Sequence, residues 1–105
     1  MFLIARTGNH VTVTLHGELD YANTPQTRTT LRTAVLFAKD VTVDLAAVTF
    51  MDCATVNELT WAARLARGRG GTLTLANPQG TPRRILTILG IPFQENKRET
   101  ADDQL

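Results

Sequence analysis

The sequence contains no serine and a single cysteine, Cys53, among its 105 residues. One cysteine cannot form a disulfide within the chain, so the fold cannot depend on one, as is usual in a reducing compartment. Without serine, a serine/threonine kinase could modify this chain only on threonine. Aromatic residues are also few, with four Phe, one Tyr and one Trp. Most of them lie within apolar runs, which argues against a surface that stacks single-stranded nucleic acid.

Neither sign of charge is in excess, because eleven Lys and Arg face ten Asp and Glu. A formal net charge of +1 gives the molecule no overall field that would draw it to a polyanion. No apolar run approaches the ~18 residues of a membrane span. The apolar start at 1–4 meets Arg6 too soon to form a signal peptide. We therefore expect a cytoplasmic protein that neither inserts into a membrane nor binds nucleic acid directly.

The length of the chain is that of one domain, which we place at 1–95, followed by a polar and flexible tail at 96–105. Between Val11 and Leu19 apolar and polar residues alternate, as in a strand with one buried face. The run 41–50 is apolar nearly throughout and β-branched, so we expect it at the sheet centre with both faces covered. The predicted strands are 2–6, 11–19, 41–50, 72–76 and an edge strand at 91–94.

Three helices are predicted, at 24–38, from 55 to the glycines at 68–71, and at 81–89. Threonine followed by proline suggests that Thr24 and Thr81 cap the first and third helices. In the second, Thr55 and Glu58 have the spacing of a capping box. The resulting order, β-β-α-β-α-β-α-(β), predicts an α/β fold with a mixed sheet of four or five strands and parallel crossovers.

The candidate site lies where the third predicted strand ends and the second helix begins, at 50–55. Loops and unpaired helix N–H groups meet ligands and partners at such junctions. Asp52 either stabilises the helix by its position beside the helix N-terminus or belongs to that site. Cys53 could be a reactive thiolate there, but His10 and His16 have no spacing that marks a Cys-His pair or a zinc site. We expect no enzyme activity, no metal and no cofactor.

Four short segments follow one another along the chain: LHGELD at 15–20, VDL at 43–45, VTFMD at 48–52 and GTLTLAN at 71–77. Together, and in this order, they resemble the STAS domain family, the sulfate transporter and anti-sigma factor antagonist family, in which LHGELD is similar to the end of the second strand. The resemblance spans about 3–95. It implies a STAS fold and the function of a bacterial anti-sigma factor antagonist, which regulates transcription by binding an anti-sigma factor. That partner is usually a serine/threonine kinase of the histidine-kinase-like ATPase fold.

The chain departs from the family at the motif commonly written Asp-Ser-Ser-Gly, whose second serine is usually phosphorylated by that kinase. Asp52 matches the aspartate, Cys53 and Ala54 replace the two serines, and Thr55 replaces the glycine. Ala54 cannot accept phosphate, which leaves Thr55 as the possible acceptor. The resemblance and the strand ends together predict a partner-binding face formed by Asp20, Asp52, Cys53, Ala54, Thr55 and Asn57.

The sequence is also compatible with two other functions. STAS domains also occur as accessory subunits of membrane lipid-transport or signalling-scaffold complexes. A third hypothesis makes Cys53 the sensor of a redox switch that forms an intermolecular disulfide or another adduct.

Overall fold

A computed structural model describes residues 2–95 of the chain, and the predicted tail at 96–105 lies outside them. Within these residues a four-stranded sheet has the spatial order β1-β2-β3-β4, the same as the chain order. β1 pairs antiparallel with β2, whereas β2–β3 and β3–β4 are parallel. The elements are β1 (Phe2–Thr7), β2 (His10–Leu19), a 3₁₀ turn (Tyr21–Asn23), α1 (Thr24–Phe37), β3 (Asp40–Met51), α2 (Cys53–Gly68), β4 (Thr72–Ala76) and α3 (Gly80–Leu89).

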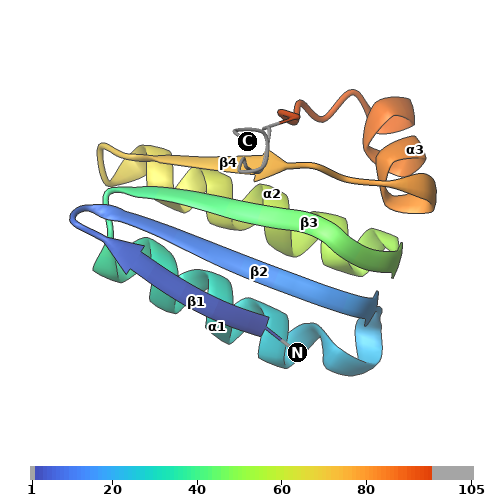
Figure 1. Cartoon of the computed structure of the whole chain (residues 1–105), viewed down its shortest axis with the longest axis horizontal. Helices are drawn as coiled ribbons and strands as arrows, with labels where there is room; N and C mark the ends of the chain where they lie inside the picture. Colours follow the sequence, from blue (N-terminus) through green and yellow to red (C-terminus); the bar gives the residue numbers. More distant parts are fainter. Residues whose placement is uncertain (1, 96–105) are drawn as a thin grey trace, which may run out of the picture.

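The predicted mixed sheet with parallel crossovers is therefore confirmed, but the expectation that β3 is covered on both faces is wrong. Val41, Val43 and Leu45 are buried, while the intervening Thr42 and Asp44 are only half-buried. The reason is handedness. Successive right-handed crossovers in one direction place both connecting helices on the same side of the sheet. Figure 1 accordingly shows α1 and α2 side by side behind the strands, with α3 beside the end of β3.

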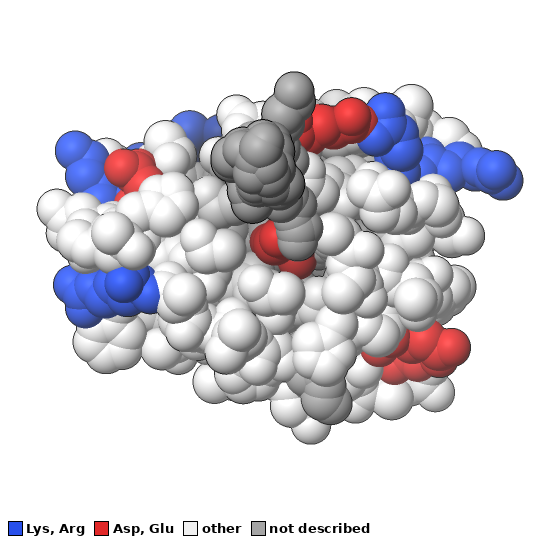
Figure 2. All heavy atoms as spheres, in the orientation of Figure 1, with Lys and Arg blue, Asp and Glu red and all other residues white. Residues whose placement is uncertain are grey.

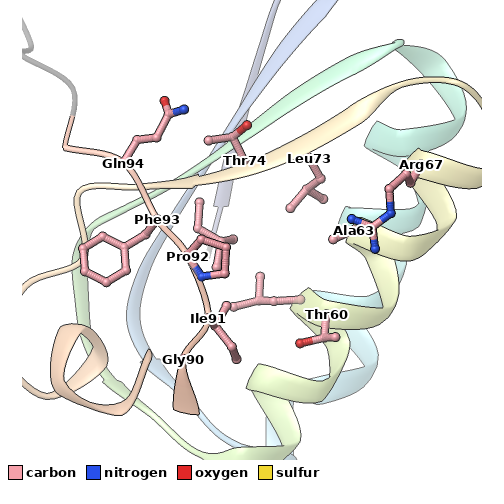
Figure 3. Close-up of a pocket in the computed structure, with 12 residues that line it drawn as sticks. Thr60, Ala63, Arg67, Leu73, Thr74, Gly90, Ile91, Pro92, Phe93 and Gln94 are labelled. Atoms are coloured by element: carbon pink, nitrogen blue, oxygen red, sulfur yellow. The ribbon is translucent and has the colours of Figure 1, made fainter. Parts of the chain in front are cut away.

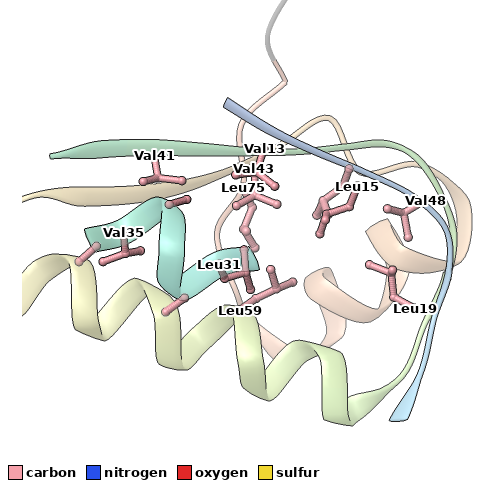
Figure 4. Packing of buried hydrophobic residues seen from close by; sticks show 14 of the residues in the cluster. Val13, Leu15, Leu19, Leu31, Val35, Val41, Val43, Val48, Leu59 and Leu75 are labelled. Carbon is pink, nitrogen blue, oxygen red and sulfur yellow. The ribbon is translucent and has the colours of Figure 1, made fainter. Parts of the chain in front are cut away.

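The core fills the space between the sheet and the two parallel helices (Figure 4). Val13, Val43 and Leu45 from the sheet are fully buried, as are Leu31 from α1 and Leu59 from α2. The period of two along β2 and β3 and the three- and four-residue spacing along the helices turn these apolar side chains to the same layer. Packing in this core fixes the positions of β2 and β3, and so places the C-terminal ends of both strands at the candidate site.

The predicted threonine caps are wrong at all three helices. Residues Asn23, Asp52 and Gln79 occupy the N-cap positions, and among them only Asp52 accepts a hydrogen bond from its helix. Thr24 is the first residue of α1, and its hydroxyl donates to the Asp20 carbonyl at 3.1 Å. A hydroxyl inside the first turn can satisfy a carbonyl elsewhere, which sequence spacing does not reveal.

At the C-terminal end of the described residues, one prediction is confirmed and one is wrong. Gly90, with φ of +71°, ends α3 in the left-handed conformation as expected. The predicted edge strand at 91–94 is reduced to one parallel bridge between Ala76 and Gln94. Gln94 donates its N–H to Leu75 and accepts from Asn77, so this segment closes only the end of the β4 edge.

Candidate functional site

Asp20 and Asp52 lie 32 positions apart in the sequence but follow neighbouring parallel strands. Leu19, the last residue of β2, is paired in register with Met51, the last residue of β3. The Asp52 N–H donates to the Leu19 carbonyl at 3.2 Å. Because parallel strands end at the same edge of a sheet, both carboxylates reach that edge together. The predicted site residues Asp20, Asp52, Cys53, Ala54 and Thr55 are therefore brought to one place.

Asp52 joins the two loops that leave this edge. Its Oδ1 accepts the Thr55 N–H at 3.0 Å, which caps α2, and its Oδ2 accepts the Tyr21 N–H at 3.0 Å. One carboxylate thus accepts from a backbone N–H of the turn after β2 and from one in the first turn of α2, and hydrogen bonds to an ionised group of this kind are strong at helix N-termini. The position of Asp52 sets the geometry of the whole edge.

Replacing Asp52 is therefore expected to lower stability. For Asp52→Ala we expect a loss of about 2 kcal/mol in the free energy of unfolding, at the upper end of the range for a lost cap. Asp52→Asn should lose less, because its amide oxygen can still accept the Thr55 N–H although its NH2 group cannot accept from Tyr21. Urea unfolding of the three proteins measures this order, and an Asn variant as unstable as the Ala variant would contradict it.

Asp20 organises the first loop in a similar way. Its side chain accepts the Ala22 N–H at 3.0 Å, and the Asn23 side chain accepts the Asp20 N–H at 3.0 Å. This reciprocal pair is a capping box on the short 3₁₀ turn, a feature the sequence analysis did not predict. The loop after β2 is therefore held by its own side chains.

Thr55 is fully buried, with no exposed area. It lies inside α2, and the predicted capping box with Glu58 is wrong because Asp52 occupies the cap position. The Thr55 hydroxyl lies 3.0 Å from the Leu19 carbonyl and 3.2 Å from Asp52 Oδ1, and shares its proton between them. A kinase could reach this hydroxyl only if the edge opened, so phosphorylation of Thr55 stays a prediction with this geometry against it.

Several residues of this edge are accessible to solvent, whereas Thr55 is buried. Cys53 and Asn57 are exposed and Ala54 is half-buried in the first turn of α2. Two aromatic residues that the sequence analysis missed flank Asp52: Tyr21 is 79% exposed and Phe50 is 41% exposed. Exposed aromatic side chains are frequent energetic centres of protein interfaces. Alternation along β3 gives no signal for Phe50, because the alternation of buried and exposed residues breaks after Leu45.

The edge is acidic. Glu18, Asp20 and Asp52 lie at or just beyond the strand ends, and the segments 7–27 and 40–63 contain no Lys or Arg. Figure 2 shows acidic atoms gathered at the lower right, where the C-terminal end of β2 and the loop that follows it lie in Figure 1. The edge is thus negative, with two exposed aromatic side chains, Tyr21 and Phe50, beside Asp52.

An ion pair behind this edge joins the two helices. Arg28 of α1 contacts Glu58 of α2, with Nη2 to Oε2 at 2.8 Å and Nε to Oε1 at 3.1 Å. The hydrogen bonds from Arg28 hold the pKa of the Glu58 carboxyl below its usual 4.5. Arg28 is the first basic residue after the segment 7–27, and its charge is balanced by Glu58. It therefore does not neutralise the carboxylates of the edge.

The lowered pKa of Glu58 makes a prediction about pH. A folded-state pKa below the unfolded value favours folding above about pH 4.5, and this contribution is lost as pH falls through the lower folded value. Glu58→Gln should therefore unfold at a lower temperature than the parent at pH 7, and the difference should shrink as the pH is lowered below 4.5. Glu18→Gln, which removes an exposed carboxylate with no ion pair within residues 2–95, is the control.

A separate groove of about 420 Å³ lies between α2, β4 and the segment that follows Gly90 (Figure 3). Its lining is mostly apolar, with Leu73, Ile91 and Phe93 among the residues that form it and Arg67 at its side. None of the predicted site residues lines it. No group of three or more potential metal ligands is found among the residues that the structure describes.

These features define a small two-layer α/β domain whose ordered acidic edge is built by a strand-loop-helix junction. The chain belongs to the STAS domain family: the family model described as "Mlab, STAS domain" matches residues 2–92. No curated protein is a significant sequence match.

Similar solved structures include two of the anti-sigma factor antagonist SpoIIAA. Its unphosphorylated form is 25% identical with a TM-score of 0.82, covering 99% of this chain and 95% of that one. Its phosphorylated form, from Bacillus, is 26% identical with a TM-score of 0.76, covering 99% and 98%. An anti-sigma factor antagonist from Mycobacterium paratuberculosis shares the fold at 20% identity, with a TM-score of 0.81 over 98% of this chain and 88% of that one.

Proposed function

We propose that this protein is an anti-sigma factor antagonist that acts by binding, without catalysis, through the acidic edge formed by Asp20, Asp52 and the first turn of α2. The single observation that carries the proposal is the pairing of the ends of β2 and β3, which brings these carboxylates together on a STAS fold. Likeness to the antagonist SpoIIAA over nearly the full chain supports it. The bound partner is an anti-sigma factor, and its release of a sigma factor regulates transcription.

The partner best suited to this edge is a histidine-kinase-like ATPase that presents basic side chains around an apolar hollow. Such a surface complements the negative charge of the edge and receives the exposed rings of Tyr21 and Phe50. Charged residues around the rim speed association, while the rings supply the contacts that slow dissociation. We place this interaction in the cytoplasm.

Control by phosphorylation differs from that of the relative. SpoIIAA has been solved in phosphorylated and unphosphorylated forms. Here Ala54 stands in the half-buried position that the family motif assigns to the phosphorylated serine, and the neighbouring Thr55 hydroxyl is buried and hydrogen-bonded. The protein therefore works as a constitutive antagonist, whose effect is set by its abundance rather than by a phosphate.

Capture from cell lysate tests this function. The full chain is immobilised and incubated with lysate in the presence or absence of ATP, and mass spectrometry identifies bound proteins and any phosphothreonine. A histidine-kinase-like ATPase that binds equally with and without ATP supports the proposal. Phosphate on Thr55 together with ATP-dependent release would overturn the constitutive part. Capture of lipid-transport subunits alone would favour the accessory-subunit function instead.

A further inference from the structure

The helical layer carries a charge opposite in sign to the rest of the described chain. Residues 24–39 and 53–69, which form α1, α2 and their ends, contain six basic residues and one acidic residue, Glu58. The remaining residues between 2 and 95 contain three basic and six acidic residues. Because α1 and α2 cover only one face of the sheet (Figure 1), this sequence asymmetry becomes a positive face on the folded molecule.

Large apolar side chains are exposed among these basic residues. Trp61 is 45% exposed, Leu36 is 54% and Phe37 is 65%. The guanidinium of Arg32 lies over the Trp61 ring, 4.3 Å from its centroid. Leu36 and Phe37 line a shallow hollow between α1 and α2. Lys39 and Arg69 are the basic residues that line the same hollow. We call the outer surface formed by these two groups and Arg64 the helical patch.

We propose that the helical patch binds the surface of an anionic lipid membrane. Basic side chains are attracted to acidic headgroups, while tryptophan and aliphatic side chains insert into the boundary between headgroups and acyl chains. The helical patch combines both properties on one face. No helix between residues 2 and 95 is long and apolar enough to cross a membrane, so the binding is peripheral.

A nucleic acid is the other polyanion that a basic face could bind, and the side chains favour lipid. Leu36 and Phe37 offer nothing to a phosphate backbone but can enter the acyl boundary. One face of the Trp61 ring is already covered by Arg32, which leaves that face unavailable for stacking on a base. Membrane binding also leaves the acidic edge free, because Asp20 and Asp52 lie at the opposite end of α1 and α2 from Lys39 and Arg69.

Trp61 is the only tryptophan and lies in the helical patch, so its fluorescence reports binding directly. The full chain is titrated with vesicles of phosphatidylglycerol and phosphatidylcholine, or of phosphatidylcholine alone, at 0.1 M salt. We expect a blue shift of Trp61 emission, and quenching by brominated acyl chains, with the anionic vesicles only. Raising the salt should reverse binding by screening the charges. An unchanged spectrum, or a shift with duplex DNA but not with vesicles, overturns the proposal.

A matched pair of variants tests whether the helical patch itself binds. Each basic side chain near an anionic surface is worth about fivefold in affinity, so Arg64→Gln should weaken vesicle cosedimentation about fivefold. Arg84→Gln removes the same charge from an exposed position on α3, outside the patch, and should change it less than about twofold, because distant charges are screened. Equal losses in the two variants would show a response to net charge alone and overturn the assignment to this surface. Circular dichroism confirms that both variants fold.

Discussion

Ala54→Glu is expected to weaken partner binding by at least about 100-fold while leaving the domain folded. Ala54 is half-buried in the first turn of α2, so the partner would bury the new carboxylate at the contact with no basic side chain placed to pair with it. Taking an unpaired charge out of water at an interface costs several kcal/mol. Folding should not suffer, because α2 has no acidic residue in its first turn and a carboxylate there stabilises a helix by roughly 0.3–1 kcal/mol.

The matched control is Ala54→Gln, which adds nearly the same volume without charge. We expect it to weaken binding less than about tenfold, and calorimetric titration of the captured partner measures both variants. Equal losses would mean that bulk rather than charge matters at this position. Asp52→Lys is a poorer test than either variant, because Asp52 caps α2 and holds the Tyr21 N–H, so its loss mixes folding with binding.

Gly71→Ala should produce a large loss of stability. A Cβ at this position would lie 1.8 Å from the Lys39 carbonyl oxygen, which also accepts the Thr72 N–H at the start of the β3–β4 pairing. The backbone must move to make room, and overpacking of this kind costs about 3 kcal/mol at the upper end of its usual range. For a domain of this size we expect the melting temperature to fall by more than about 10 °C.

Gly68→Ala provides the comparison for this effect. Gly68 is the last residue of α2, and a Cβ there meets nothing within 4 Å. Alanine favours the helix over glycine by up to about 1 kcal/mol, so this variant should be as stable as the parent or more stable. If the two alanine variants melted at similar temperatures, close packing of Gly71 against Lys39 would not be the reason for the glycine.

The regular elements could be predicted because their signals are local. Alternation between Val11 and Leu19 and the helical spacing of Leu31, Ala34 and Val35 follow from one periodicity each. The caps could not be predicted in the same way. The Thr55 hydroxyl contacts Leu19, 36 positions away, and the partner of Glu58 is Arg28 on another helix. The spacing of Thr55 and Glu58 suggests a capping box, but both side chains instead contact residues that lie far away in the sequence.

The one-sided sheet explains what was missed at the site. An apolar run such as β3 is compatible with burial on one face or on both, and only the handedness and order of the crossovers decide between them. Since the outer face stays open, Phe50 points away from the core beside Asp52 and remains partly exposed. Asp20 and Asp52 were predicted together from the family resemblance, and the register of Leu19 with Met51 gives the physical reason.

The most direct test of the acidic edge as the binding surface uses the single, exposed Cys53. A thiol-reactive photo-crosslinker attached there lies in the first turn of α2, next to Ala54. After irradiation of the labelled full chain in cell lysate, we predict a covalent adduct with a histidine-kinase-like ATPase, and its absence when the label is carried by the Ala54→Glu variant. An adduct unaffected by Ala54→Glu, or adducts with membrane-transport subunits only, would contradict the account.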